Sequence, residues 1–158
     1  MVRCLSKLMQ KPVLGYYSGQ ILGAVSGFTL NPETHHLLDV SVKRHKWSAV
    51  REYRMCDISR DSSRLSLLAY VEEGERRDRG DDDRYIGFPL CIGVSVLTHA
   101  QSRGQIADIW VNWPSGTVAW YEVSRGYLDD MRRGRAYARG YWVKTNHANW
   151  LFQCVQEV

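Results

Sequence analysis

The chain has 158 residues, a formal net charge of +4, 44% hydrophobic residues and 11% aromatic residues. This length suits one medium domain or two small ones, and the apolar and aromatic content supports a packed core and argues against intrinsic disorder. No apolar run approaches the roughly 20 residues of a membrane-spanning helix, and the first residues lack the apolar block of a secretory signal. The sequence therefore predicts a soluble, cytoplasmic protein without an integral membrane segment.

Charge divides the chain into three segments. Residues 1–71 hold ten Lys and Arg against five Asp and Glu, and residues 84–158 hold eight against five. Residues 72–83, EEGERRDRGDDD, hold seven acids and three arginines. Such a polar run cannot bury enough surface to order itself, which indicates a linker or an exposed loop. We expect one domain over 1–71, an acidic linker over 72–84 and a second domain over 85–158.

The first half reads as short strands joined by turns. One helical turn is compatible with residues 6–9, and apolar residues then alternate over 25–30 and again over 38–42. The intervening Asn-Pro-Glu-Thr, residues 31–34, has turn chemistry because Asn favours the first turn position and Pro presets the next φ. This pattern predicts a β-hairpin, followed by short strands near 53–58 and 64–70.

The second half repeats this organisation. Alternating apolar residues predict a hairpin over 104–123, with its turn at Pro114-Ser115-Gly116. Residues 126–133 are compatible with a short helix, and strands are expected at 136–143 and 149–155.

The two hairpins align at an offset of 81 positions. The aligned residues are identical or similarly apolar: Gly23 with Gly104, Val25 with Ile106, Phe28 with Ile109, Leu30 with Val111, Asn31 with Asn112, Leu37 with Val118 and Val42 with Val123. Upstream, the same offset sets Leu5 on Ile86 and Val13 on Val94; downstream, an offset of 85 sets Leu67 on Phe152. Two copies of short strands indicate an all-β fold in which each copy closes into a small five- or six-stranded barrel.

The repeated motif resembles the PRC-barrel family. The matching residues of the first copy are Lys11-Pro12-Val13, Gly19, Gly23, Val25, Asn31-Pro32-Glu33-Thr34 and Asp57-Ile58. Those of the second copy are Gly104, Ile106, Asp108-Ile109, Pro114-Ser115-Gly116 and Tyr121-Glu122-Val123-Ser124. The leading segment of the second copy lacks the Lys-Pro-Val and the first glycine. The resemblance implies two small PRC-type β-barrels in tandem, joined by the acidic linker.

The resemblance also implies a class of function. PRC-barrels include the cytoplasmic domain of the photosynthetic reaction-centre H subunit and the C-terminal domain of a ribosome-maturation factor, and members generally dock to partners and are not enzymes. We therefore expect a non-catalytic adaptor or assembly factor that docks to a protein complex. Two alternatives stay open: a peripheral subunit or assembly factor of a reaction centre at the cytoplasmic face of a membrane, and a binding protein linked to RNA and ribosome maturation.

Catalytic and metal-binding patterns are weak. The chain has none of the common nucleophile, metalloprotease or phosphate-loop motifs. His35 and His36 lie in the predicted turn, where adjacent side chains diverge and no third ligand lies nearby in sequence, so solvated imidazoles are the simpler interpretation. The cysteines lack paired spacing and read as free thiols: Cys4, Cys56, Cys91 and Cys154. We expect no catalytic, cofactor or metal site.

A basic and aromatic segment is the first candidate for partner binding. It contains Tyr127 and four arginines: Arg125, Arg132, Arg133 and Arg135. Arginine with aromatic residues suits a protein interface, and it equally suits nucleic acid through phosphate contacts and base stacking. A solvated loop beside core aromatics is the third interpretation.

Tryptophans of the second hairpin are the other candidate: Trp110, Trp113 and Trp120. Strand alternation places Trp113 on one face with Ile109, and Trp110 on the opposite face. We expect Trp110 and Trp120 to pair across the hairpin on the outer face, where they either cover the first barrel or await a partner.

Overall fold

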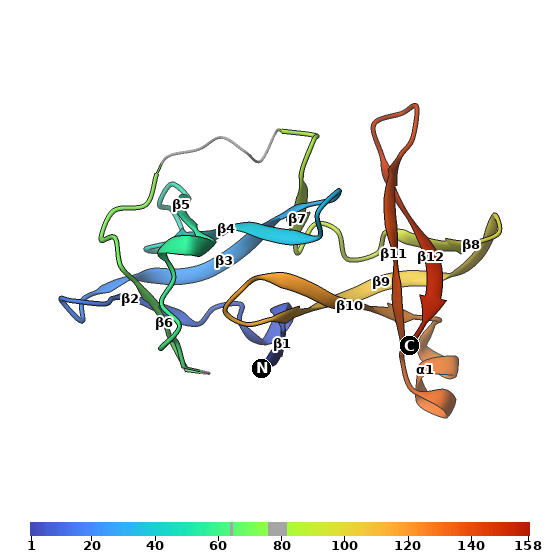
Figure 1. Cartoon of the computed structure of the whole chain (residues 1–158), viewed down its shortest axis with the longest axis horizontal. Coiled ribbons are helices and arrows are strands. Elements are labelled where there is room, and N and C mark those ends of the chain that lie inside the picture. Colours follow the sequence, from blue (N-terminus) through green and yellow to red (C-terminus); the bar gives the residue numbers. More distant parts are fainter. Residues whose placement is uncertain (64, 76–81) are drawn as a thin grey trace.

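Twelve hydrogen-bonded strands form one mixed sheet in the computed structural model, which describes residues 1–63, 65–75 and 82–158 (Figure 1). The first half contains β1 (Val2–Cys4), η1 (Leu5–Lys7), β2 (Pro12–Gly15), β3 (Ile21–Asn31), β4 (His36–Lys43), β5 (Arg51–Arg54), η2 (Met55–Asp57) and β6 (Leu67–Ala69). The second half contains β7 (Ile86–Phe88), β8 (Ser95–Thr98), β9 (Gln101–Asn112), β10 (Thr117–Ser124), α1 (Tyr127–Arg133), β11 (Ala136–Lys144) and β12 (Trp150–Glu157). The prediction of a mostly β chain is confirmed. Within the predicted acidic linker, residues 76–81 lie outside the described residues.

Strand pairing follows the same circuit in both halves. In the second half, β8, β9, β10, β11 and β12 pair antiparallel in turn, and β12 then pairs in parallel with β8. In the first half, β2 to β5 pair antiparallel in turn and β6 pairs in parallel with β2. A bridge between Ile58 and Ala69 connects the segment after β5 to β6. The sequence repeat is therefore also a repeat of strand pairing.

The register of the leading strands corrects one part of the alignment. Val13 pairs with Gly23, whereas Val96 pairs with Gly104. The structural equivalent of Val13 is thus Val96 and not Val94, so this segment follows an offset of 83 rather than 81. A shift of two residues leaves every side chain on the same face, which is why alternation alone did not detect it.

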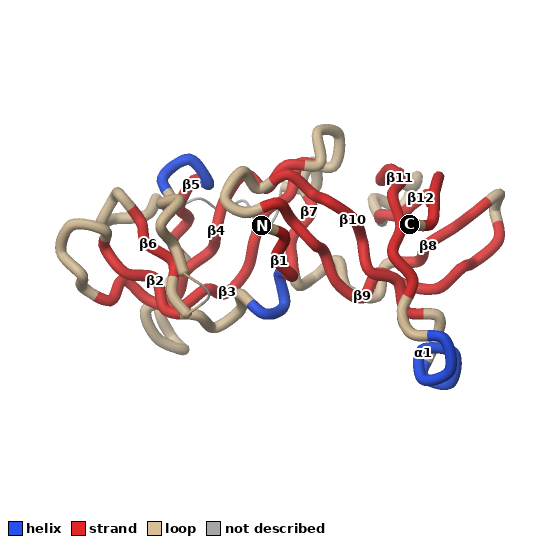
Figure 2. Tube along the Cα trace, turned by 60° about the horizontal axis from the view of Figure 1, so that its bottom comes forward, coloured by secondary structure: helices blue, strands red, loops and turns tan. Residues whose placement is uncertain are grey.

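Each half contributes a strand to the other half. The first strand of the chain, β1, pairs with β9 of the second copy, and β7, at the start of the second copy, pairs with β3 of the first. Cys4 lies opposite Trp110, and Gly87 lies opposite Thr29, at equivalent register positions. Figure 2 shows both exchanged strands in the middle of the molecule. The halves are therefore joined by strand exchange as well as by the connecting segment.

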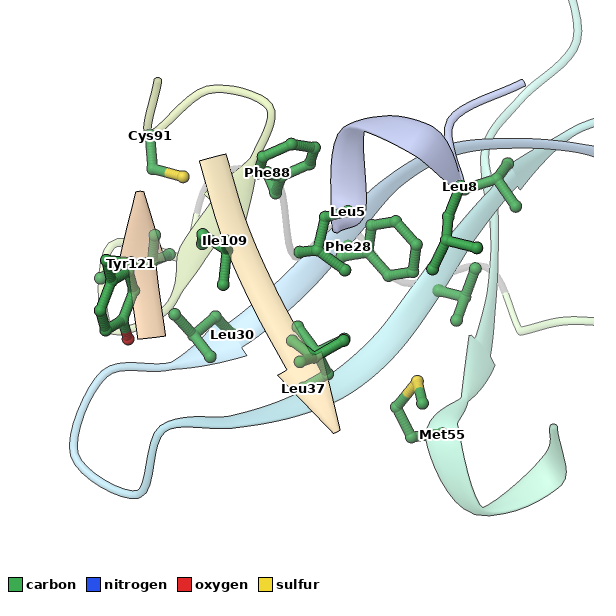
Figure 3. Close-up of a cluster of buried hydrophobic side chains, with 14 of the residues drawn as sticks. Leu5, Leu8, Phe28, Leu30, Leu37, Met55, Phe88, Cys91, Ile109 and Tyr121 are labelled. Carbon is green, nitrogen blue, oxygen red and sulfur yellow. The ribbon is translucent and has the colours of Figure 1, made fainter. Parts of the chain in front are cut away.

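The tips of the two hairpins also meet. Thr117 pairs with its own repeat equivalent, His36. The Leu37 N–H donates to the Gly116 carbonyl at 2.9 Å, and the Val118 N–H donates to the His35 carbonyl at 2.8 Å. Such reciprocal bonds between equivalent positions indicate an approximate two-fold relation between the copies. The buried side chains form one continuous core across this junction (Figure 3).

One side-chain contact across the junction involves a predicted turn histidine. His35 Nδ1 lies 2.7 Å from the hydroxyl of Tyr121, which also accepts a hydrogen bond from the Trp142 indole at 3.0 Å. His35 is half-buried and has a φ of 55°. Burial, followed by the neighbouring His36, lowers the pKa of His35 below its ordinary value. The interpretation of His35 as a solvated imidazole is therefore replaced by a structural role.

This contact predicts a pH-dependent stability. The unfolded chain binds a proton at His35 near pH 6.5, whereas the folded protein binds it only at lower pH. The free energy of unfolding should therefore fall as the pH drops through this window, because the unfolded state binds more protons. Urea denaturation at several pH values measures the slope, and we expect His35→Gln to reduce it. The control His147→Gln, in the exposed turn before β12, should retain the wild-type slope; an unchanged slope in His35→Gln would contradict the assignment.

Candidate docking surfaces

Helix α1 presents an apolar face to solvent. No residue of the helix is buried, and Tyr127, Leu128 and Met131 are 78%, 68% and 67% exposed. Positions separated by three or four residues are neighbours on a helix, and Met131 is three residues from Leu128 and four from Tyr127, so Met131 joins the other two side chains into one surface. Figure 2 shows α1 projecting away from the strands of the second half.

Polar contacts hold α1 in place in the absence of burial. Asp130 accepts hydrogen bonds from the Ser124 hydroxyl at 2.6 Å and from the Arg125 N–H at 3.0 Å. These two bonds, in that order, lower the pKa of the Asp130 carboxyl. Arg135 lies 3.6 Å from Asp130 and donates to Glu122 at 2.8 Å. Asp130 thus anchors α1 to the C-terminal end of β10.

The structure divides the predicted arginines into two groups. Arg135 pairs with Glu122 and Asp130, and Arg125 pairs with Glu157 at 3.0 Å, so both belong to the anchoring of this region. Arg132 and Arg133 are exposed in the last turn of α1. They share the helix with Tyr127, as the basic-aromatic pattern suggested. Leu128 and Met131 were missed, although the sequence shows Met131 at helical spacings of four residues from Tyr127 and three from Leu128.

The predicted pairing of two tryptophans on the outer face is confirmed. Trp110 and Trp120 lie opposite each other on β9 and β10, with ring centroids 6.1 Å apart. Tyr137 of β11 packs edge-on against both rings, at 6.3 and 6.1 Å. The Trp110 indole donates to Glu122 at 2.7 Å. Both tryptophans are half-buried, so Tyr137 of the same half covers part of the surface they were expected to offer.

Trp113 lies in the core, which corrects its assignment to a docking surface. Its side chain is 5% exposed and belongs to the buried cluster. The guanidinium of Arg3 lies 5.3 Å from the centroid of its ring. Arg3 also donates to the carbonyls of Ser62 and Ser63. Trp113 therefore helps to join the N-terminal strand, the first half and the second half.

A cluster of tyrosines forms a second exposed surface, on the first half. The parallel pairing of β2 with β6 sets Gly15 beside Ala69, so Tyr16 and Tyr70 leave the sheet side by side. Their ring centroids are 4.9 Å apart, and Tyr17 lies 5.1 Å from Tyr16. Tyr17 is 80% exposed, and the Tyr16 hydroxyl donates to Asp61 at 3.3 Å.

Sequence reasoning missed this tyrosine cluster because only the register of a parallel pair brings residues 16 and 70 together. The equivalent positions of the second copy, which follow Thr98 and Cys154, are His99 and Val155. The cluster is therefore specific to the first copy. The one local signal was the exposed Tyr-Tyr pair before a Ser-Gly turn.

The outer faces of the two central hairpins differ strongly. Asp108 and Glu122 lie opposite each other on the second copy, where their equivalents on the first copy are Gly27 and Ser41. A hollow of about 1130 Å³ lies over the first copy, lined in part by Gly27, Ser41 and Phe88. Two carboxylates occupy this face on the second copy, whereas two small residues line the hollow on the first.

No helix within residues 1–63, 65–75 and 82–158 is long and apolar enough to cross a membrane. Among the described residues, the apolar face of α1 and the tyrosine cluster both expose aromatic side chains; the first lies on a single helix, and the second joins residues that follow β2 and β6. Comparison with protein-family models and with curated proteins gives no match to this chain, so the role of these surfaces follows from their chemistry.

Proposed function

We propose that the protein is a non-catalytic adaptor or assembly factor built from two tandem PRC-type barrels. The observation that carries the proposal is α1, a helix that buries none of its residues yet is held by Asp130. Three large apolar side chains kept in solvent on a fixed element are typical of a protein-interaction site. The closed circuits of strand pairing and the residues that resemble the PRC motif support the two barrels.

The chemistry of α1 suggests how a partner recognises it. Tyr127, Leu128 and Met131 fit an apolar groove, and Tyr and Met are enriched at interface cores. Arg132 and Arg133 follow directly and suit acidic side chains at the rim of that groove. We therefore infer a protein partner with an apolar groove bordered by acids.

An adaptor needs a second contact, and the tyrosine cluster supplies one. The turn after β2 and the end of β6 lie at the end of the molecule opposite α1 (Figure 1). Tyrosine presents a large contact area with few rotatable bonds, which lowers the entropic cost of binding. The continuous sheet between the two ends would hold two bound partners at a fixed separation.

The test is quantitative affinity capture from the native cell, with the double variant Leu128→Ser/Met131→Ser. Both residues are exposed, so the variant should fold normally. Its affinity for the main partner should fall about tenfold or more, because removing interface anchors costs about 2 kcal/mol or more of binding free energy. The matched control is Leu90→Ser, which removes a leucine that is 83% exposed elsewhere on the surface. Binding of the purified partner should show the same difference.

The captured partner also separates the alternatives. A photosynthetic membrane complex would favour the reaction-centre role, and ribosomal components with strongly salt-sensitive binding would favour the RNA-linked role. The adaptor proposal fails if the wild-type protein captures no stable partner, or if the double variant captures it as well as the Leu90→Ser control does.

A further inference from the structure

Three buried side chains with metal-ligating atoms converge beneath the N-terminal strand. They are Cys4 of β1, Asp108 of β9 and Glu122 of β10, and their ligand atoms lie within 4.8 Å of one another. Cys4 Sγ lies 2.6 Å from Asp108 Oδ2. All three residues are at most 8% exposed. A thiol and two carboxylates with this spacing match the ligand types of a zinc-class ion.

Strand register explains why these residues meet. Asp108 and Glu122 are direct partners across β9 and β10, so their side chains share one face of the hairpin. The exchanged strand β1 pairs with β9 and places Cys4 opposite Trp110, two positions from Asp108. The cluster thus depends on strand exchange, since its thiol comes from the first copy and its carboxylates come from the second.

The barrel architecture does not require this cluster. The equivalents of Cys4, Asp108 and Glu122 in the other copy are Gly87, Gly27 and Ser41, at the same register. That copy forms the same strand circuit without a thiol or a carboxylate at these positions. The combination of a thiol and two carboxylates is therefore specific to one copy, and closing the strand circuit does not depend on it.

The charges of the cluster suit a divalent cation. Two buried carboxylates contribute a charge of −2, and Arg135, which bonds to Glu122 at 2.8 Å, contributes +1. A Cys4 thiolate would bring the sum to −2, which one divalent ion neutralises. Two like charges buried side by side are unfavourable unless cations or hydrogen bonds compensate them, so a bound ion would stabilise this arrangement.

We propose that Cys4, Asp108 and Glu122 form a binding site for a zinc-class divalent metal ion. Zinc binds thiolate sulfur at about 2.3 Å and carboxylate oxygen at about 2.0–2.2 Å, so three ligands of one ion must lie close together, as these three atoms do within 4.8 Å. The Trp110 indole and Arg135 donate to the two oxygens of Glu122, and the N–H groups of Ser6 and Ile109 donate to Asp108. These outer contacts would orient the carboxylate ligands.

Cobalt provides a direct probe of the thiolate ligand. Metal-free wild-type protein, reduced and titrated with Co²⁺, should develop the near-ultraviolet charge-transfer band of a cobalt–thiolate bond at one equivalent per chain. Zinc should then displace the cobalt and abolish the band. Zn²⁺ should also raise the melting temperature of the wild-type protein, because it binds the folded state preferentially.

Variants assign the band to this cluster. Cys4→Ser should lose the band, and Asp108→Asn should weaken cobalt binding by about tenfold or more. Cys56→Ser is the matched control, because Cys56 is an exposed cysteine outside the cluster, and it should keep the band. Circular dichroism checks that each variant is folded. The absence of a band in wild-type protein would overturn the site, and a band that persists in folded Cys4→Ser would place the metal at another cysteine and overturn it equally.

Discussion

Replacing Gly104 with alanine should lower the free energy of unfolding by about 3 kcal/mol or more. Gly104 has a φ of 133°, a conformation that side chains rarely adopt. A β-carbon there would lie 2.2 Å from the Ser124 carbonyl oxygen, so β9 and β10 would have to separate. Chemical denaturation measures the effect. Gly23 is the repeat equivalent of Gly104; it has a φ of 151°, and a β-carbon there would clash with the Lys43 carbonyl. Gly23→Ala should therefore lower the free energy of unfolding to a similar extent.

Gly134 separates the conformational effect from the steric one. It also has a positive φ, 73°, but a β-carbon there would meet no atom within 4 Å. Gly134→Ala should therefore cost only about 1 kcal/mol. Equal losses in Gly104→Ala and Gly134→Ala would show that the close approach of the strands is unimportant.

Replacing Trp113 with alanine should cost about 3–5 kcal/mol, the range for removing a large aromatic side chain from a core. The side chain is 5% exposed, and its ring lies beneath the buried guanidinium of Arg3. Its loss would leave a cavity where the N-terminal strand meets both copies. Thermal or urea denaturation measures this change, whereas a docking residue would alter binding and leave stability unchanged.

Trp113→Phe is the informative companion variant. Within the described residues, the Trp113 indole nitrogen has no hydrogen-bond partner, so phenylalanine keeps much of the packing and loses no such bond. We expect it to retain most of the stability that Trp113→Ala loses. If both variants were as stable as the wild-type protein, Trp113 would not be a core residue.

Much of the local structure was predictable because it follows from residues close together in the sequence. Alternation placed Ile109 and Trp113 on one face and Trp110 on the opposite face, and the burial of Ile109 and Trp113 agrees with this division. The turn chemistry located both hairpins. The short helix near 126–133 was found as α1, from Tyr127 to Arg133.

The arrangement of distant segments was not predictable from these patterns. A strand's alternation shows which side chains face inward but not which strand lies beside it, so the exchange of β1 and β7 left no local signal. The tyrosine cluster and the Cys4–Asp108 contact depend on pairings between residues 54 and 104 positions apart. Trp113 was misassigned because an aromatic residue near a turn suits a surface and a core equally.

Strand exchange also bears on why the copies have diverged. A chain with one copy could complete its pairing only by giving its first strand to a second identical chain, which would make both surfaces of the resulting dimer the same. Joining the copies in one chain makes this pairing intramolecular, at an effective concentration on the order of millimolar. Each half then always pairs with the other half of the same chain. Each half is then free to change on its own, and one chain can present a tyrosine surface at one end and a projecting helix at the other.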